Sequence, residues 1–158
     1  IGNPFPKMTY SFTLGFSWKN FDLNTFWQGG SGIYRYYWEQ ATITNGGNMT
    51  TRWLDRWSET NPYGSMPKLG NAFNEKYSSF WLNKADYLRL KNIELGYTFD
   101  KKLVRYIGAS SLRVYVQASN LLTLTSLKNY DPEKNSGDTR GDVHPNVKSF
   151  SFGVNVNF

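Results

Sequence analysis

The ten residues from Ser149 to Phe158 alternate without a break between apolar and small or polar side chains. Successive side chains of a strand point to opposite faces, so this segment predicts a strand with one apolar and one polar face. The apolar positions are Phe150, Phe152, Val154, Val156 and Phe158. The length suits a strand that crosses a bilayer in an outer-membrane barrel. A strand of a water-soluble sheet can show the same alternation, so the pattern alone leaves both structures open.

Four more segments alternate in this way, and together they predict an all-β fold of about five antiparallel strands. They are residues 8–18, 21–28, 85–99 and 111–122. The two-residue connection Lys19-Asn20 between the first two is typical of a hairpin. Phe26 is an exception, because it is an aromatic residue on the otherwise polar side of its strand.

The third of these segments changes phase near Asn92. Leu88 and Leu90 precede this point and Ile93 and Leu95 follow it, so the two pairs would face opposite sides of a regular strand. We therefore expect either a β-bulge near Asn92 or an upstream half that projects beyond the bilayer.

The connections between the expected strands alternate short and long. The short ones are residues 19–20 and 100–110, the latter with one helical turn near 101–106, and the long ones are residues 29–83 and 126–146. Long structureless loops are uncommon in compact soluble domains, whereas outer-membrane barrels have short periplasmic turns and long extracellular loops. Five strands are too few to close a barrel, and lipid tolerates no open sheet edge. The chain should therefore be the C-terminal part of a large transmembrane β-barrel, incomplete as a single chain.

The composition agrees with a sheet that meets lipid on one face and water on the other. Aromatic residues make up 18% of the chain, yet its mean hydropathy is negative. The sequence has no run of about 18 apolar residues, so it predicts no transmembrane helix, and it has no cysteine. The net charge of +6 is dispersed, apart from a group at Lys101, Lys102 and Arg105 that we interpret as a turn. Dispersed charge favours a solvated surface over a nucleic-acid footprint. The chain begins at Ile1 with no signal sequence, so we expect it to be a piece of a longer protein.

The segment DYLRLKNIELGY at residues 86–97 resembles the YLRLKNI-x-LGY strand of SusC/RagA-type TonB-dependent outer-membrane transporters. Three further segments resemble this family in the same order. They are RWSETNP at 56–62, LRVY at 112–115 with SNLLT at 119–123, and YDPE at 130–133. The match is strong over residues 52–158, and residues 1–51 agree only in pattern. The chain departs from the family after Thr98, where Phe99-Asp100 stands in place of the frequent Leu-Pro.

The resemblance implies that residues 1–158 are a C-terminal barrel segment without the plug and the remaining strands. It implies a parent protein in the outer membrane of a Gram-negative bacterium that imports glycans or peptides. The implied partners are the rest of the transporter, a SusD-like surface lipoprotein, the TonB complex through the missing N-terminal part, and membrane lipid. No enzymatic activity, cofactor or nucleic acid is implied. The alternatives are a soluble carbohydrate-binding β-sandwich module and, less favoured, a nucleic-acid binder.

Two sets of aromatic residues are candidates for a functional role. The first set lies in the long loop and could contact a substrate or a partner, or could form a small core of the loop itself. Its members are Tyr34, Tyr36, Tyr37, Trp38, Trp53 and Trp57. The second set lies near strand ends, where aromatic girdles anchor barrels at the membrane interface. Its members are Trp18, Trp27, Tyr97 and Phe158.

Acidic residues gather in the second long loop, at Asp131, Glu133, Asp138 and Asp142. Carboxylates suit calcium, but their spacing matches no EF-hand loop, so a solvated loop is the favoured interpretation. His144 is the only histidine and lacks a second partner for metal or acid–base chemistry. We therefore expect no metal and no catalytic residues.

Overall fold

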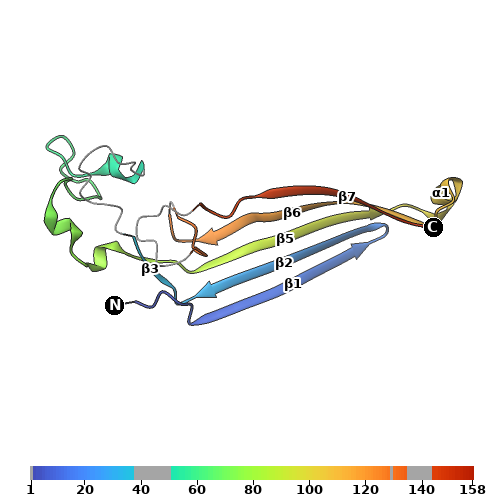
Figure 1. Cartoon of the computed structure of the whole chain (residues 1–158), viewed down its shortest axis with the longest axis horizontal. Helices are drawn as coiled ribbons and strands as arrows, with labels where there is room; N and C mark the ends of the chain where they lie inside the picture. Colours follow the sequence, from blue (N-terminus) through green and yellow to red (C-terminus); the bar gives the residue numbers. More distant parts are fainter. Residues whose placement is uncertain (1, 38–50, 129, 135–143) are drawn as a thin grey trace.

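The computed structural model describes residues 2–37, 51–128, 130–134 and 144–158. Its main element is an antiparallel sheet of five strands in the order β1-β2-β5-β6-β7 (Figure 1). The strands are β1 (Met8–Trp18), β2 (Phe21–Ser31), β5 (Tyr87–Thr98), β6 (Ser111–Thr125) and β7 (Ser149–Asn157). Each strand pairs with its neighbours in this order, and β1 and β7 are the two edges of the open sheet. The predicted all-β fold of five antiparallel strands is confirmed.

The predicted strand limits are correct for β1 and need small corrections elsewhere. β2 continues to Ser31 and β6 to Thr125, whereas β5 begins at Tyr87. The continuation of β2 is Gly29-Gly30-Ser31, which shows no apolar alternation, so there the pattern ends before the strand pairing does. In β6 the alternation continues through Leu124, and the predicted limit is too short. The expected helical turn is present as α1 (Lys101–Val104) followed by the 3₁₀ turn η4 (Arg105–Ile107).

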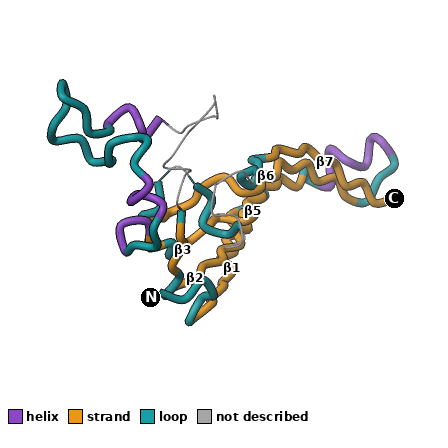
Figure 2. Tube along the Cα trace, turned by 60° about the vertical axis from the view of Figure 1, so that its left-hand side comes forward, coloured by secondary structure: helices purple, strands orange, loops and turns teal. Residues whose placement is uncertain are grey.

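The first long connection is more ordered than its lack of periodicity indicates. It contains a second, two-stranded sheet of β3 (Tyr34–Tyr36) and β4 (Leu82–Lys84). Between these strands lie the 3₁₀ helices η1 (Thr51–Asp55), η2 (Ala72–Glu75) and η3 (Ser79–Trp81). Figure 2 shows this helical segment extending away from the end of the main sheet.

A β-bulge lies at the predicted phase change. Phe26 of β2 pairs with Asn92, but Trp27 pairs with Leu90, so Lys91 has no partner in β2. Because one residue is skipped, Leu90 returns to the face that Ile93 occupies. β6 is also irregular here, and Asn120 adopts a positive φ of 54°, which asparagine tolerates better than most residues.

The two faces of the main sheet differ as the alternation predicts. Cross-strand pairs on one face are apolar, for example Phe12 with Trp27 and Val116 with Phe152. Phe12, Val116 and Phe152 are exposed, as is Phe16 of the same face at 65%, whereas Trp27 is half-buried. The opposite face carries serine, threonine, asparagine and charged residues. No second layer among the described residues covers the apolar face, since the only other described sheet is the small β3–β4 pair. A sandwich would need such a layer.

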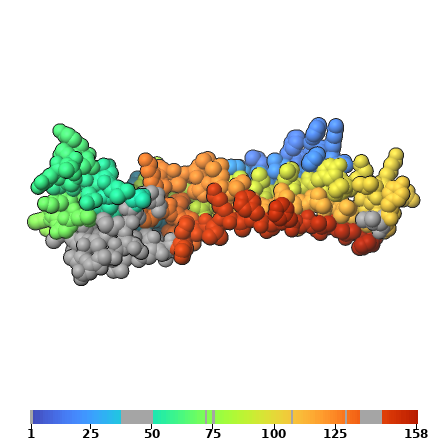
Figure 3. All heavy atoms as spheres, turned by 90° about the horizontal axis from the view of Figure 1, so that it is seen from above, coloured from blue at the N-terminus to red at the C-terminus, as the bar shows by residue number. Residues whose placement is uncertain are grey.

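The two ends of the main sheet also differ, as the alternating connections predict. The Lys19-Asn20 turn, α1 and residue 158 lie at one end, and the described parts of the long connections lie at the other (Figure 1). We call these the turn end and the loop end. In the space-filling view β7 follows the edge of the sheet between them (Figure 3). No helix in the described part of the chain is long and apolar enough to cross a membrane, a finding that concerns helices only.

The buried hydrophobic clusters lie at the loop end. One consists of Ile33, Tyr37, Ala85 and Leu127, against which Tyr87 and Tyr130 pack. The other consists of Trp53, Met66 and Trp81, against which Tyr36 and Leu69 pack. These clusters fix the loops, whereas the middle of the sheet relies on its backbone hydrogen bonds and on side chains along its two faces.

Candidate functional site

Three strands are joined by charges on the polar face of the sheet. Arg113 of β6 donates from Nε to Asp22 Oδ1 of β2 over 3.0 Å and also pairs with Asp22 Oδ2. Its Nη2 donates to Glu94 Oε1 of β5 over 2.7 Å. Gly96 lies beneath the guanidinium, and a Cβ at this position would clash with it. The glycine of the LGY motif therefore leaves room for the arginine that ties β6 to its neighbours.

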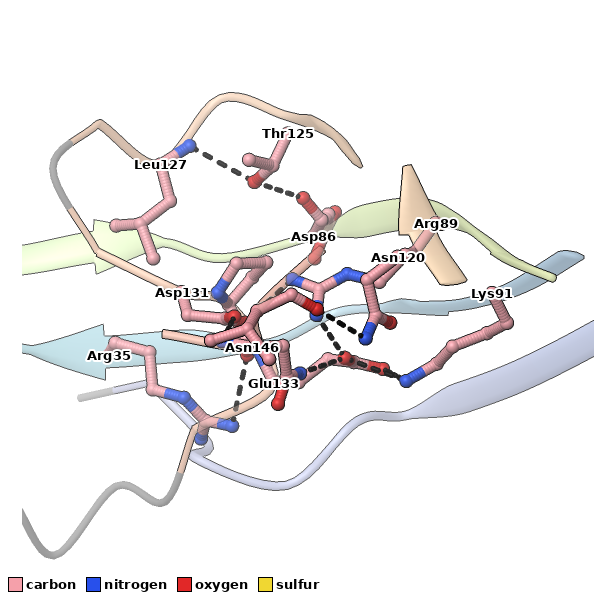
Figure 4. Close-up of polar contacts among 12 residues, drawn as sticks. Arg35, Asp86, Arg89, Lys91, Asn120, Thr125, Leu127, Asp131, Glu133 and Asn146 are labelled. Carbon is pink, nitrogen blue, oxygen red and sulfur yellow. Dashed lines mark hydrogen bonds and ion pairs between the residues drawn. The ribbon is translucent and has the colours of Figure 1, made fainter. Parts of the chain in front are cut away.

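A second charged network holds the second long loop against the sheet. Arg89 of β5 pairs with Asp131 Oδ1 over 2.7 Å and with Glu133 Oε2 over 2.6 Å. Lys91, the residue at the bulge, pairs with Glu133 Oε1 over 2.7 Å. The side chains of Arg89 and Asp131 are each only 3% exposed. Figure 4 shows these residues converging from β5 and from the loop. The bulge therefore places Lys91 where it can share Glu133 with Arg89.

Asp131 is the acceptor at the centre of this second network. Its carboxylate also accepts the backbone N–H groups of Glu133 over 3.0 Å and of Asn146 over 2.8 Å. Burial alone would raise the pKa of Asp131, but the hydrogen bonds from Arg89, Asn146 and Glu133 outweigh it and hold that pKa below its ordinary value. The Asn146 side chain donates to Glu133 Oε2 over 2.7 Å. Asn146, near the end of the loop, is therefore bonded to the carboxylates of Asp131 and Glu133.

The YDPE segment thus has a different role from the solvated loop that we expected. Asp131 is buried and ion-paired, so that interpretation is wrong for this residue. Asp138 and Asp142 lie outside the described residues, and His144 is exposed. No group of three or more potential metal ligands is gathered in the part of the chain that the structure describes.

Arg35 of β3 ties a third segment to the same end. It is 8% exposed and donates to the backbone oxygen of Pro4, with a longer contact of 3.5 Å to the oxygen of Pro132. Sequence reasoning missed the roles of Arg35, Arg89 and Arg113. A signal existed for Arg113, since Asp22 and Glu94 share its predicted polar face and an antiparallel register brings them together.

The RWSETNP segment folds around one carboxylate. Asn61 Nδ2 donates to Asp55 Oδ1 and Ser65 N–H donates to Asp55 Oδ2, each over 3.1 Å. The hydrogen bonds from Ser65 and Asn61 hold the pKa of Asp55 below its ordinary value. Ser58 and Asn61 also exchange backbone hydrogen bonds of 3.2 Å and 3.0 Å. The asparagine of this motif therefore closes the loop in a fixed shape.

The loop aromatics fall into different environments. Tyr37 stacks on Tyr130 with ring centroids 4.0 Å apart, and Trp53 packs against Trp81. Tyr37 and Trp53 are 4% and 2% exposed, so in this conformation they pack inside the buried clusters of the loop end. Tyr34 and Tyr36 are half-buried, and Trp38 lies outside the described residues. A contact role for this set stays a prediction.

Trp57 is the most exposed of the described loop candidates, at 37%. The Lys68 ammonium lies 5.6 Å from the centroid of its ring. Both residues line a groove of about 480 Å³, with Phe73 and Phe80 among its walls. This groove is therefore an aromatic surface that the loop offers to a ligand or partner.

Three of the expected anchors lie at the turn end. Trp18 is 58% exposed, with the Lys19 ammonium 4.8 Å from its ring. Tyr97 packs between Phe21 and Phe99, at 4.8 and 5.0 Å between centroids. Phe158 is 89% exposed. Trp27 stacks on Phe12 nearer the loop end, about 20 Å along β2 from Phe21 at the usual rise per residue. The anchoring role itself stays a prediction.

Known proteins resemble this chain along its whole length. TonB-dependent receptor P3 of Formosa agariphila is 32% identical over 100% of the chain and 17% of the receptor. TonB-dependent receptor SusC of Bacteroides thetaiotaomicron is 29% identical over 92% of the chain and 14% of the receptor. No family model matches.

A solved structure of the RagAB peptide transporter superposes on 97% of the chain and 17% of its own, with a TM-score of 0.76 and 31% identity. The chain thus spans less than a fifth of the length of these relatives. The comparison of sequences, the comparison of structures and the four sequence motifs all identify the same family of proteins. The chain therefore belongs to the SusC/RagA-type family of TonB-dependent receptors, as a β-barrel segment of such a receptor.

Proposed function

We propose that this chain forms part of the barrel wall of an outer-membrane, TonB-dependent nutrient importer in a Gram-negative bacterium. In this proposal the sheet is the C-terminal part of the barrel, and the plug and the other strands belong to the rest of the receptor. The strands outside the chain pair with the β1 and β7 edges, because an unpaired backbone group in lipid costs several kcal/mol.

The observation that carries the proposal is the apolar face of the sheet. Phe12, Phe16 and Phe152 belong to this face and are 42%, 65% and 84% exposed. Contiguous apolar patches of more than a few hundred Å² are rare on soluble monomers. The face extends over β1 from Tyr10 to Trp18, roughly 27 Å at 3.4 Å per residue, close to the ~25 Å apolar band of an outer-membrane barrel.

The polar face suits the interior of a transport barrel. Arg113, Asp22 and Glu94 are between 22% and 30% exposed, so their charges are satisfied by each other and remain accessible to water. The plug of the receptor would lie on this side. Signals from the TonB complex would reach the barrel through the plug, which lies outside this chain.

The loop end would then face the outside of the cell and meet a SusD-like lipoprotein. The groove beside Trp57 and Lys68 supports this orientation, because it offers an open aromatic surface next to buried clusters that hold the loop in shape. The substrate class is a glycan or a peptide. The relatives are named as receptors and transporters, which supports a role without covalent chemistry. No observation favours a carbohydrate-binding sandwich.

The proposal is tested with the full-length receptor, expressed in a strain that lacks it. We expect the protein to sediment with the outer membrane and to resist extraction without detergent. Uptake of labelled peptides or oligosaccharides should depend on the receptor and should stop when an uncoupler collapses the proton-motive force. Recovery of the receptor in the soluble fraction, or uptake that is insensitive to the uncoupler, would contradict the proposal.

A further inference from the structure

A cleft of about 760 Å³ lies at the turn end, where the apolar face of the sheet stops. Tyr97 and Phe99 of the apolar face form one wall, and Leu103 and Tyr106 of the α1–η4 turn form another. Leu103 and Tyr106 are 59% and 90% exposed. The cleft is therefore an extension of the apolar face beyond the last paired residues of β5.

The rim of this cleft is positively charged. Lys101 and Lys102 line it, and Arg105 follows them on the same turn. All three are exposed, and none forms an ion pair within the described ranges. Asp100 is the acidic residue of the cleft, but its carboxylate accepts a hydrogen bond of 3.1 Å from Asn20. The two ammonium groups of the rim thus form no ion pair in the described chain, and with Arg105 they outnumber the single negative charge of Asp100.

The turn holds these side chains in a defined position. Val104 and Ala109 are 1% and 5% exposed and fasten the turn to the end of the sheet. Ser110 N–H and Oγ both donate to the backbone oxygen of Asn157, over 2.7 and 3.0 Å. Gly108 reverses the chain with a φ of 75°, as a glycine does after a helical turn. The exposed positions between these fixed points are the cationic and apolar residues of the cleft.

We propose that this cleft binds one anionic glycerophospholipid from the periplasmic leaflet of the outer membrane. Lys101 and Lys102 hold its phosphate, and an acyl chain lies along Tyr97 and Phe99. The inference rests on the proposed function, because it requires the apolar face to lie in a bilayer. A free phosphate would use the two lysines only, whereas a phospholipid also uses the apolar wall that continues into the lipid-facing surface.

The test uses the full-length receptor, delipidated in detergent and titrated with dioleoylphosphatidylglycerol or dioleoylphosphatidylcholine. The two lipids share acyl chains and differ in net charge. Native mass spectrometry measures how many molecules of each stay bound. For Lys101→Gln/Lys102→Gln we expect roughly a thirty-fold loss of affinity for phosphatidylglycerol, from the usual contribution of two lysines near an anionic surface. Lys101→Arg/Lys102→Arg should retain binding.

The matched control is Lys128→Gln/Lys148→Gln, which removes two exposed lysines at the loop end and should bind phosphatidylglycerol like the unchanged receptor. The proposal is overturned if the unchanged receptor binds both lipids equally, if Lys101→Gln/Lys102→Gln binds phosphatidylglycerol as well as Lys128→Gln/Lys148→Gln does, or if inorganic phosphate displaces the lipid. Uptake by the same receptor in cells reports separately on the proposed function. If the unchanged receptor supports no uptake but still prefers phosphatidylglycerol to phosphatidylcholine, transport is refuted and the lipid site remains supported.

Discussion

Arg89 and Asp131 are 42 positions apart in the sequence, yet they form an ion pair of 2.7 Å in which both side chains are 3% exposed. One residue comes from β5 and the other from the loop that precedes β7. Loss of one member of a buried pair leaves an uncompensated charge, which costs far more than loss of an exposed pair. This pair therefore controls whether the loop stays docked on the sheet.

We expect Asp131→Ala to weaken docking of the loop by about 3–5 kcal/mol. Limited proteolysis of the full-length receptor in detergent, read by mass spectrometry, should show faster cleavage between residues 126 and 147. Lys84→Ala is the control, because it breaks the more exposed pair with Asp86 and leaves the hydrogen bond from Ile33 N–H to that carboxylate in place, so about 1 kcal/mol or less is expected. Equal cleavage of the two variants would show that the buried pair does not hold the loop.

The docking of this loop should depend on pH only in the acid range. The folded-state pKa of Asp131 is lowered from its ordinary value of 3.8, so its contribution to stability is present above that value. The contribution is lost as the pH falls through the lower, folded-state pKa. Amide exchange at Asn146, corrected for intrinsic rates, should keep its protection from pH 7 to about 5 and lose it below about 3.8, near the ordinary carboxyl pKa. Release of the loop between pH 7 and 5 would refute this assignment.

The two faces of β7 should respond differently to a new charge. Val154→Arg should cost about 2–4 kcal/mol in refolding of the complete receptor, and Ser151→Arg little, because only the first would face lipid. Ser151 is a cleaner polar-face control than Asn155, since Asn155 pairs across the sheet with Arg113 and an arginine there would add like-charge repulsion. Equal destabilisation by the two substitutions in a denaturant titration would contradict the assigned faces.

The orientation of the sheet in the membrane can be tested with single cysteines. An impermeant maleimide applied to intact cells should label Tyr63→Cys, whose parent side chain is 96% exposed at the loop end. It should also label Asn48→Cys and Asp138→Cys, which lie outside the described residues. Lys19→Cys and Lys102→Cys at the turn end should react only after the outer membrane is permeabilised. The reverse labelling pattern would mean that the loop end faces the periplasm.

Alternation was sufficient to predict the main sheet, because each strand has one apolar face. It located β1 to the residue and marked the bulge near Asn92. It could not predict β3 and β4, which are three residues long and too short for a period to show. The alternation could not predict the Arg89–Asp131 pair either, since that contact depends on where a long loop returns to the sheet. Tyr37 and Trp53 show the same limit, because composition alone does not distinguish a buried loop aromatic from one that contacts a partner.

The bulge at Lys91 has a consequence for how this segment can diverge among related receptors. Because Lys91 is the unpaired residue, its deletion alone would make the pairing of β5 with β2 regular and would keep Leu88 and Leu90 on the apolar face, with Arg89 on the polar one. A single deletion or insertion at a paired position of β5 would instead exchange the two faces on one side of the change. We therefore expect single-residue length changes of β5 in homologous chains to fall at the bulge, while the loops beyond its ends vary freely in length.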